Sequence, residues 1–370
     1  MTPQITRLIR TLLFCILSII TTFTACSAAA ESQRPYRIGV IIPLSGSVAS
    51  LGDYVRKGIE LGIAQLPAEE RKRIEVVFED DGFLPAQTVS AYRKLSAQGR
   101  LDAVFTIGTP PSLALVPLTE RDGTILVAIG ASDSAITKGR RFAFIHWVIP
   151  PLLGKTLTAE IKRRDYKRIA FVISEGTGTR ADMDATLAEF ATQGMTDRLV
   201  YKEAFPKDQT DYRSVVARLR ERKVDAIALV MFPGALAPFV KQVRGAGLKA
   251  DLVGMETFED EGEVKSSEGV LIGCWYVNAS DPSDSFIQDY KARYHEQPGW
   301  ASGNAYDSLR LVAQAATLHS NDNKKVAEFL MTLKDYDGAS GRYSASGDNR
   351  FTLPAALKIV TATGFERLPR

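Results

Sequence analysis

Cysteine and histidine are scarce in this chain, which has three of each among 370 residues. The histidines, His146, His295 and His319, are scattered along the sequence and do not have the spacing of metal ligands. No Gly-x-Ser-x-Gly elbow joins a predicted strand to a helix, so the arrangement of a nucleophilic hydrolase is missing. We therefore expect no enzyme activity, no metal and no cofactor.

An excess of one charge sign is also missing. The chain has 46 basic and 43 acidic residues, and its formal net charge is +3. Basic residues are interleaved with acidic ones, which excludes the basic surface of a nucleic-acid-binding protein. Two of the cysteines lie near the N-terminus, and Cys274 stands in an apolar run. It is therefore predicted to be a buried small hydrophobe without a disulfide partner.

The N-terminus has the pattern of an export signal. Arg7 and Arg10 precede the apolar run 12–20, and small residues follow. This run is too short for a comfortable membrane span, which needs about 20 residues. We therefore predict a signal peptide over residues 1–30 and a protein that works in the periplasm, beyond the cytoplasmic ATP pool.

Two cleavage sites fit the end of this signal. Phe23-Thr24-Ala25-Cys26 resembles a bacterial lipoprotein box, in which Cys26 would become the lipid-anchored first residue. Ala28-Ala29-Ala30 before Glu31 suits ordinary signal peptidase instead. The sequence leaves both open, with an uncleaved anchor as a third alternative.

Short apolar runs alternate with helix-period segments after the signal. This alternation predicts a parallel sheet covered by helices on both faces. The first unit has predicted strands at 37–43, 74–78, 103–107 and 124–129 and predicted helices at 52–66, 85–98 and 112–121.

Pro150-Pro151 interrupts this alternation of strands and helices, as a linker would, and the alternation resumes after it. The second unit has predicted strands at 168–173, 199–205, 225–231, 251–255 and 269–276, and predicted helices at 180–192, 212–222 and 234–246. Helices at 285–295, 301–318 and 324–333 and short strands over 341–363 follow.

The sequence thus predicts an α/β fold of two doubly wound, Rossmann-like domains joined by a multi-crossover hinge. Lobe 1 is expected to comprise residues 37–149 and 280–334, and lobe 2 residues 150–279 and 335–368. Because ligands bind at the carboxyl ends of strands in such sheets, the loops after the strands are the expected site.

Several segments together resemble a known family. They are the opening 38–46, Glu79-Asp80-Asp81 before Pro85-Ala86, and Ala305-Tyr306-Asp307 near the end. The stretch 37–365 resembles the type I periplasmic binding proteins of ABC importers, in particular the Leu/Ile/Val-binding group. This resemblance implies a monomer whose two lobes close on one amino acid or related small carboxylate and deliver it to an inner-membrane ABC permease.

The resemblance also implies site residues. Ser112 matches a serine that binds the ligand carboxylate, and a helix N-terminus would assist it with free N–H groups. Ala131 and Ser132 match the small residues that contact the amino-acid head group. Glu256 matches a glutamate that pairs with the ligand ammonium.

The chain departs from the amino-acid-binding pattern at three places. Leu51 replaces a tryptophan, 175–179 replaces a tyrosine segment, and Phe232 after Met231 keeps an aromatic face without a hydroxyl. We expect Leu51 and Phe232 to contact a ligand of different shape or larger size. Gly176-Thr177-Gly178-Thr179 does not have the ending of a phosphate-binding P-loop.

Other functions on the same fold stay open at this point. A ligand-sensing regulatory subunit and a protein-binding cell-envelope lipoprotein would both share the predicted architecture, since fold does not fix function.

Overall fold

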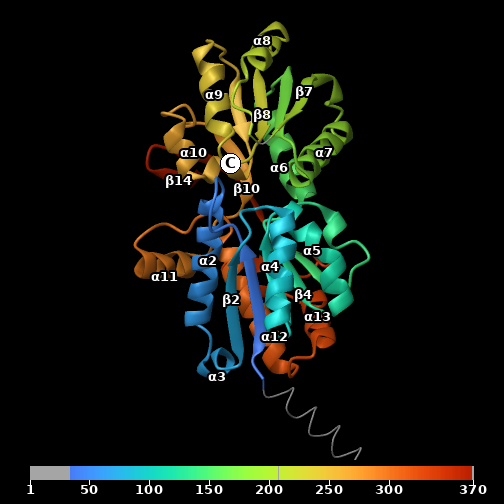
Figure 1. Cartoon of the computed structure of the whole chain (residues 1–370). Helices are drawn as coiled ribbons and strands as arrows, with labels where there is room; N and C mark the ends of the chain where they lie inside the picture. Colours follow the sequence, from blue (N-terminus) through green and yellow to red (C-terminus); the bar gives the residue numbers. More distant parts are fainter. Residues whose placement is uncertain (1–33, 207, 369–370) are drawn as a thin grey trace, which may run out of the picture.

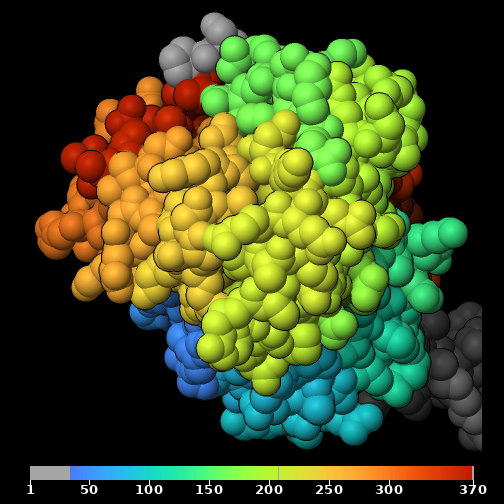
Figure 2. All heavy atoms as spheres, turned by 90° about the horizontal axis from the view of Figure 1, so that it is seen from above, coloured from blue at the N-terminus to red at the C-terminus, as the bar shows by residue number. Residues whose placement is uncertain are grey.

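The structure is a computed structural model that describes residues 34–206 and 208–368. The predicted signal peptide, both cleavage sites and Cys26 lie outside these residues. Two lobes are stacked in Figure 1, with the blue N-terminal strand in the lower one. From above, the second lobe, in green to orange, covers much of the first (Figure 2). Within the described residues, no helix is long and apolar enough to cross a membrane.

The first lobe contains a five-stranded parallel sheet in the order β2-β1-β3-β4-β5. Every residue of β1, β3, β4 and β5 is buried, as expected for strands covered on both faces. Its elements are β1 (Tyr36–Ile42), α2 (Ala49–Ala64), α3 (Ala68–Arg71), β2 (Ile74–Asp80), α4 (Pro85–Gln98), β3 (Ala103–Ile107), α5 (Thr109–Asp122), β4 (Ile125–Ile129), η1 (Ser134–Ile136) and β5 (Ala143–His146).

The second lobe contains a seven-stranded sheet in the order β14-β13-β10-β9-β8-β6-β7. Strands β6 to β10 pair in parallel, and β13 and β14 add an antiparallel edge. Its elements are α6 (Pro150–Arg163), β6 (Ile169–Ser174), α7 (Thr177–Thr192), η2 (Thr196–Arg198), β7 (Leu199–Phe205), α8 (Arg213–Glu221), β8 (Ala226–Val230), α9 (Leu236–Gly245), β9 (Asp251–Gly254), η3 (Glu256–Glu259), α10 (Glu261–Ser266), β10 (Trp275–Ala279), β13 (Ala355–Thr361) and β14 (Gly364–Arg367). The two sheets confirm the predicted fold class.

After β10 the chain crosses back to the first lobe. Helices α11 (Asp284–Tyr294) and α12 (Ser302–Leu318) pack on α2, and α13 (Asn323–Met331) packs near β4. The short strands β11 (Tyr336–Gly338) and β12 (Gly341–Tyr343) follow.

The segment after β12 still lies on the first lobe. The backbone N–H of Ile145, in β5, donates to the Asn349 carbonyl at 3.0 Å, and Ile145 forms an isolated parallel bridge with Arg350. The chain therefore returns to the second sheet only with β13. This differs from the boundary expected at residue 335, because the hydrophobic pattern of short strands does not say which sheet they join.

Four local predictions differ from the structure. Pro150-Pro151 opens α6 and is not a linker, since proline has no N–H to leave unpaired in the first helical turn. Helix α5 begins at Thr109, before Ser112, and α7 begins at Thr177, before Arg180. The predicted strand over 269–276 is a turn up to residue 274, followed by β10.

A glycine lets α2 and α12 approach each other closely. A Cβ added at Gly58 would lie 2.2 Å from the Ser302 carbonyl oxygen, which is backbone and cannot rotate away. We expect Gly58→Ala to lower the free energy of unfolding by about 1–3 kcal/mol, as overpacking does.

Chemical denaturation would measure this effect. Gly245→Ala is the control, because that helical glycine has nothing within 4 Å of an added Cβ. Because Gly245 is the last residue of α9, the control should stabilise the protein by at most about 0.5 kcal/mol. Equal effects of the two substitutions would refute the close contact.

Candidate ligand-binding cleft

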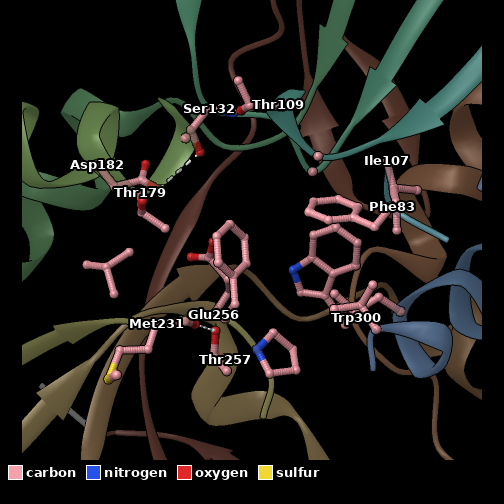
Figure 3. A pocket seen from close by; sticks show the side chains of 18 of the residues that line it. Phe83, Ile107, Thr109, Ser132, Thr179, Asp182, Met231, Glu256, Thr257 and Trp300 are labelled. Carbon is pink, nitrogen blue, oxygen red and sulfur yellow. Dashed lines mark hydrogen bonds between the residues drawn. The ribbon is translucent and has the colours of Figure 1, made fainter. Parts of the chain in front are cut away.

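A cavity lies between the two lobes, at the carboxyl ends of the parallel strands. Both lobes contribute side chains to its wall (Figure 3). The lining residues are Val48, Leu51, Phe83, Ile107, Gly108, Thr109, Pro110, Gly130, Ser132 and Trp300 from the first lobe and Gly178, Thr179, Asp182, Val230, Met231, Phe232, Pro233, Glu256, Thr257 and Asp260 from the second.

Four of the six predicted site residues reach this cavity, namely Leu51, Ser132, Phe232 and Glu256. Ser112 is fully buried behind the wall, and Ala131 is 1% exposed. Neither of these two side chains lies among the lining residues.

The position of Ser112 follows from the early start of α5. Its hydroxyl donates to the Gly108 carbonyl at 2.5 Å and shares a hydrogen bond of 2.7 Å with the Thr106 hydroxyl. Thr109, at the first position of α5, lines the cavity instead. Ser112 thus fixes the turn that leads into the helix, and Thr109 faces the space between the lobes.

Two helix N-termini meet at the cavity. A Cβ added at Gly178, in the first turn of α7, would lie 2.8 Å from the Thr109 Oγ1 of α5. The Thr109 hydroxyl accepts the backbone N–H of Ser132 at 3.1 Å. Because α5 and α7 belong to different lobes, Gly178 allows the lobes to approach at this point.

Ser132 also links the lobes directly. Its hydroxyl donates to Asp182 Oδ2 at 3.1 Å, the bond drawn as a dashed line in Figure 3. A second link lies near the cavity, where the Ser50 hydroxyl donates to Asp260 Oδ2 at 3.3 Å. Hydrogen bonds across the cleft therefore favour the closed arrangement seen here.

Asp182 is the acidic residue that the sequence analysis missed. It is 1% exposed, and its Oδ1 has no hydrogen-bond partner among the described residues. Burial raises the pKa of the Asp182 carboxyl well above its usual range, and the nearby Glu256 carboxyl raises it further. Its place within the predicted helix 180–192 gave no sign that it would face a cavity.

Glu256 lies at the start of η3, directly after β9 and Met255. Its Oε2 is buried without a hydrogen-bond partner in the part of the chain that the structure describes. Burial raises the pKa of this carboxyl as well. Two buried carboxyl groups with unpartnered oxygens thus face one small cavity.

Aromatic rings form the apolar part of the wall. Phe83, from the loop before α4, meets Phe232 of the second lobe edge to face at a centroid distance of 5.9 Å. The Trp300 indole lines the cavity beside Phe83 in Figure 3, and its centroid lies 5.2 Å from that of Trp147. Phe83 and Trp300 lie in loops far apart in sequence, so no local pattern predicted that they would meet.

The space that these residues enclose is about 60 Å³. An engineered cavity of roughly 150 Å³ is known to take up benzene. A bound ligand the size of an amino acid therefore requires the lobes to lie somewhat farther apart than in this arrangement, which hinged domain movement allows.

The sequence matches the periplasmic binding protein family over residues 35–364. A Leu/Ile/Val-binding protein homologue from Brucella melitensis is 23% identical over 334 residues, which cover 86% of this chain and 90% of the relative. The leucine-binding protein LivK from Thermotoga maritima superposes with a TM-score of 0.84 at 19% identity, covering 90% of this chain and 97% of that one.

A solute-binding protein of an ABC transporter from R. palustris, solved with benzoate, has a TM-score of 0.80 at 18% identity and covers 90% of this chain and 95% of its own. At these identities the superpositions establish the two-lobed fold. The match over almost all of the described residues, together with the cleft between the lobes, shows that the chain belongs to the periplasmic binding protein family, in its Leu/Ile/Val-binding group.

Proposed function

We propose that the protein is a solute receptor of an ABC importer, which captures an amino acid or a related small molecule by lobe closure and delivers it to an inner-membrane permease. It would act as a monomer in the periplasm, either free or anchored through Cys26. Its ligand contacts are Leu51, Ser132, Phe232 and Glu256, with Thr109 in the place expected for Ser112.

The observation that carries this proposal is the unpartnered Glu256 carboxylate oxygen in a cavity between two lobes. A buried polar atom without a partner costs roughly 1–3 kcal/mol, which a ligand donor would recover. Ligand contacts to both lobes would favour the closed form, because a ligand shifts an equilibrium only through its differential affinity. The permease could then distinguish loaded from empty receptor by shape.

Binding of apolar amino acids to the chain from residue 31 onward tests the proposal. Glu256→Gln keeps the size of the side chain and removes its charge, so the affinity for the ligand found should fall by about 1–3 kcal/mol. Titration calorimetry would measure this loss, and thermal shift would show that the variant is folded.

Glu261→Gln is the control, since Glu261 is exposed at the start of the neighbouring helix α10 and does not line the cavity. Equal affinities of the parent protein and Glu256→Gln would remove Glu256 from the site. If no small amine, amino acid or acid shifted the melting temperature, the receptor proposal itself would fail.

A further inference from the structure

We infer that this cleft selects its ligand by an ammonium group held between Asp182 and Glu256, and that a ligand carboxylate adds little to binding. The ligand class is then primary amines with an apolar or aromatic body, and amino acids belong to it through their ammonium end. The inference rests on the proposed receptor function and names the chemistry that this receptor takes.

The first observation is Asp182 itself. It lies in the second turn of α7, 1% exposed, and lines the cavity with an Oδ1 that has no hydrogen-bond partner among the described residues. Its Oδ2 accepts the Ser132 hydroxyl, so the carboxyl plane is fixed from the opposite lobe. Desolvating a carboxylate in this way is costly unless a positive partner arrives.

The second observation is the charge of the whole wall. Asp182, Glu256 and Asp260 line the cavity, and no lysine, arginine or histidine does so among the residues that the structure describes. Both carboxylate oxygens of Asp260 already have hydrogen-bond partners, because Oδ1 accepts the Glu263 N–H at 2.9 Å and Oδ2 accepts the Ser50 hydroxyl. An ammonium group has three N–H donors and can satisfy Asp182 Oδ1 and Glu256 Oε2 together.

The third observation concerns the anion end of the site. The N-terminus of α5 is the expected carboxylate site, but Pro110 and Pro111 have no backbone N–H to donate. The Ser112 hydroxyl donates to the Gly108 carbonyl, and the Thr109 hydroxyl accepts from the Ser132 backbone. The Ser112 hydroxyl proton is therefore used within the first lobe, and the Thr109 hydroxyl proton is the side-chain donor that α5 keeps for the cavity.

At the N-terminus of α7 the first-turn backbone N–H groups are available, but the lining residues add no free side-chain donor. Thr179 lines the cavity, but its hydroxyl donates to the Ser174 carbonyl at 2.6 Å. Asp182 lies less than one turn further along the same helix, so a negative charge opposes any anion near this N-terminus. The charged side chains of the cleft wall are thus all acidic among the described residues, which favours a cation over an anion.

A matched set of three compounds tests the inference in the parent protein. Leucine carries both end groups, 3-methylbutylamine retains only the ammonium, and 4-methylpentanoate retains only the carboxylate. Phenylalanine, 2-phenylethylamine and 3-phenylpropanoate form a second set for the aromatic wall. Calorimetry at pH 7.5 measures each affinity.

We expect the amine to bind within about tenfold of the amino acid, and the acid to bind at least about tenfold more weakly than the amine. Binding of the acid as tight as that of the amino acid, with none of the amine, would overturn the inference and leave the receptor function standing. Absence of binding by all six compounds would overturn both.

Asp182→Asn isolates the residue that carries the inference. It should weaken binding of the amine by about 10- to 100-fold, because the amide can no longer attract the ammonium as a charge. It should not weaken binding of the acid. Asp184→Asn is the matched control, since Asp184 is exposed on the same helix. Equal amine affinity in the parent, Asp182→Asn and Asp184→Asn would overturn the inference.

Discussion

Replacing Gly178 by leucine is expected to weaken ligand binding about 100-fold while each lobe stays folded. A Cβ at this position would already lie 2.8 Å from Thr109 Oγ1 and 3.4 Å from Thr109 Cβ, across the cleft. The remaining side-chain atoms would hold the lobes apart. If the closed form is then populated to about 1%, the apparent dissociation constant rises by the inverse of that fraction.

Calorimetry with leucine and 3-methylbutylamine would measure the loss, and small-angle X-ray scattering would show a larger radius of gyration that ligand no longer reduces. Thr177→Leu is the control, because Thr177 is exposed in the same first turn of α7. Unchanged affinity in Gly178→Leu would mean that closure does not bring α5 and α7 together.

Acidification is expected to destabilise the protein strongly through His146. This side chain is 1% exposed, hydrogen-bonded to the Tyr343 hydroxyl at 3.0 Å and to Asn304 Nδ2 at 3.2 Å. Burial lowers the pKa of His146 to about 3, from an ordinary value of 6.5. Between about pH 6.5 and pH 3, His146 is therefore protonated in the unfolded chain and neutral in the folded chain.

The contribution of neutral His146 to the free energy of unfolding is present above pH 6.5 and is lost progressively as the pH falls toward 3, by on the order of 4 kcal/mol in all. Asp182 and Glu256 act in the opposite direction, because their pKa values are raised in the folded state.

Urea unfolding at several pH values would separate these contributions. The parent protein should lose more stability between pH 6.5 and pH 4 than His146→Gln does. His295→Gln, at an exposed position after α11, should follow the parent. A parallel pH dependence of the parent and His146→Gln would show that this histidine is charged in the folded protein.

The architecture could be predicted from the sequence because it rests on local periodicity. The buried strand β4 is a continuous apolar run, β1 and β3 each have one polar residue among apolar ones, and helix α2 buries one face with Val55, Ile59 and Gly62. Errors arose where proline and turns were involved. Pro150-Pro151 stands in the first turn of α6, which suits proline as well as a linker does.

The site could be predicted only in part, and for a physical reason. Glu256 and Ser132 directly follow strands, so the topology of a parallel sheet brings them to the cleft. Asp182 lies within a helix, where its side-chain direction depends on how α7 packs. Phe83 and Trp300 are brought together by tertiary contacts alone, and such contacts leave no trace in a local sequence pattern.

The pair of indoles at the cleft gives the molecule an optical property. The chain has three tryptophans, and two of them, Trp147 and Trp300, lie in contact beside the cavity with ring nitrogens that no described residue accepts from. Indole emission depends on the polarity around the ring. Opening of the lobes admits water to Trp300, so the intrinsic fluorescence of the unlabelled protein would report occupancy of the cleft in real time.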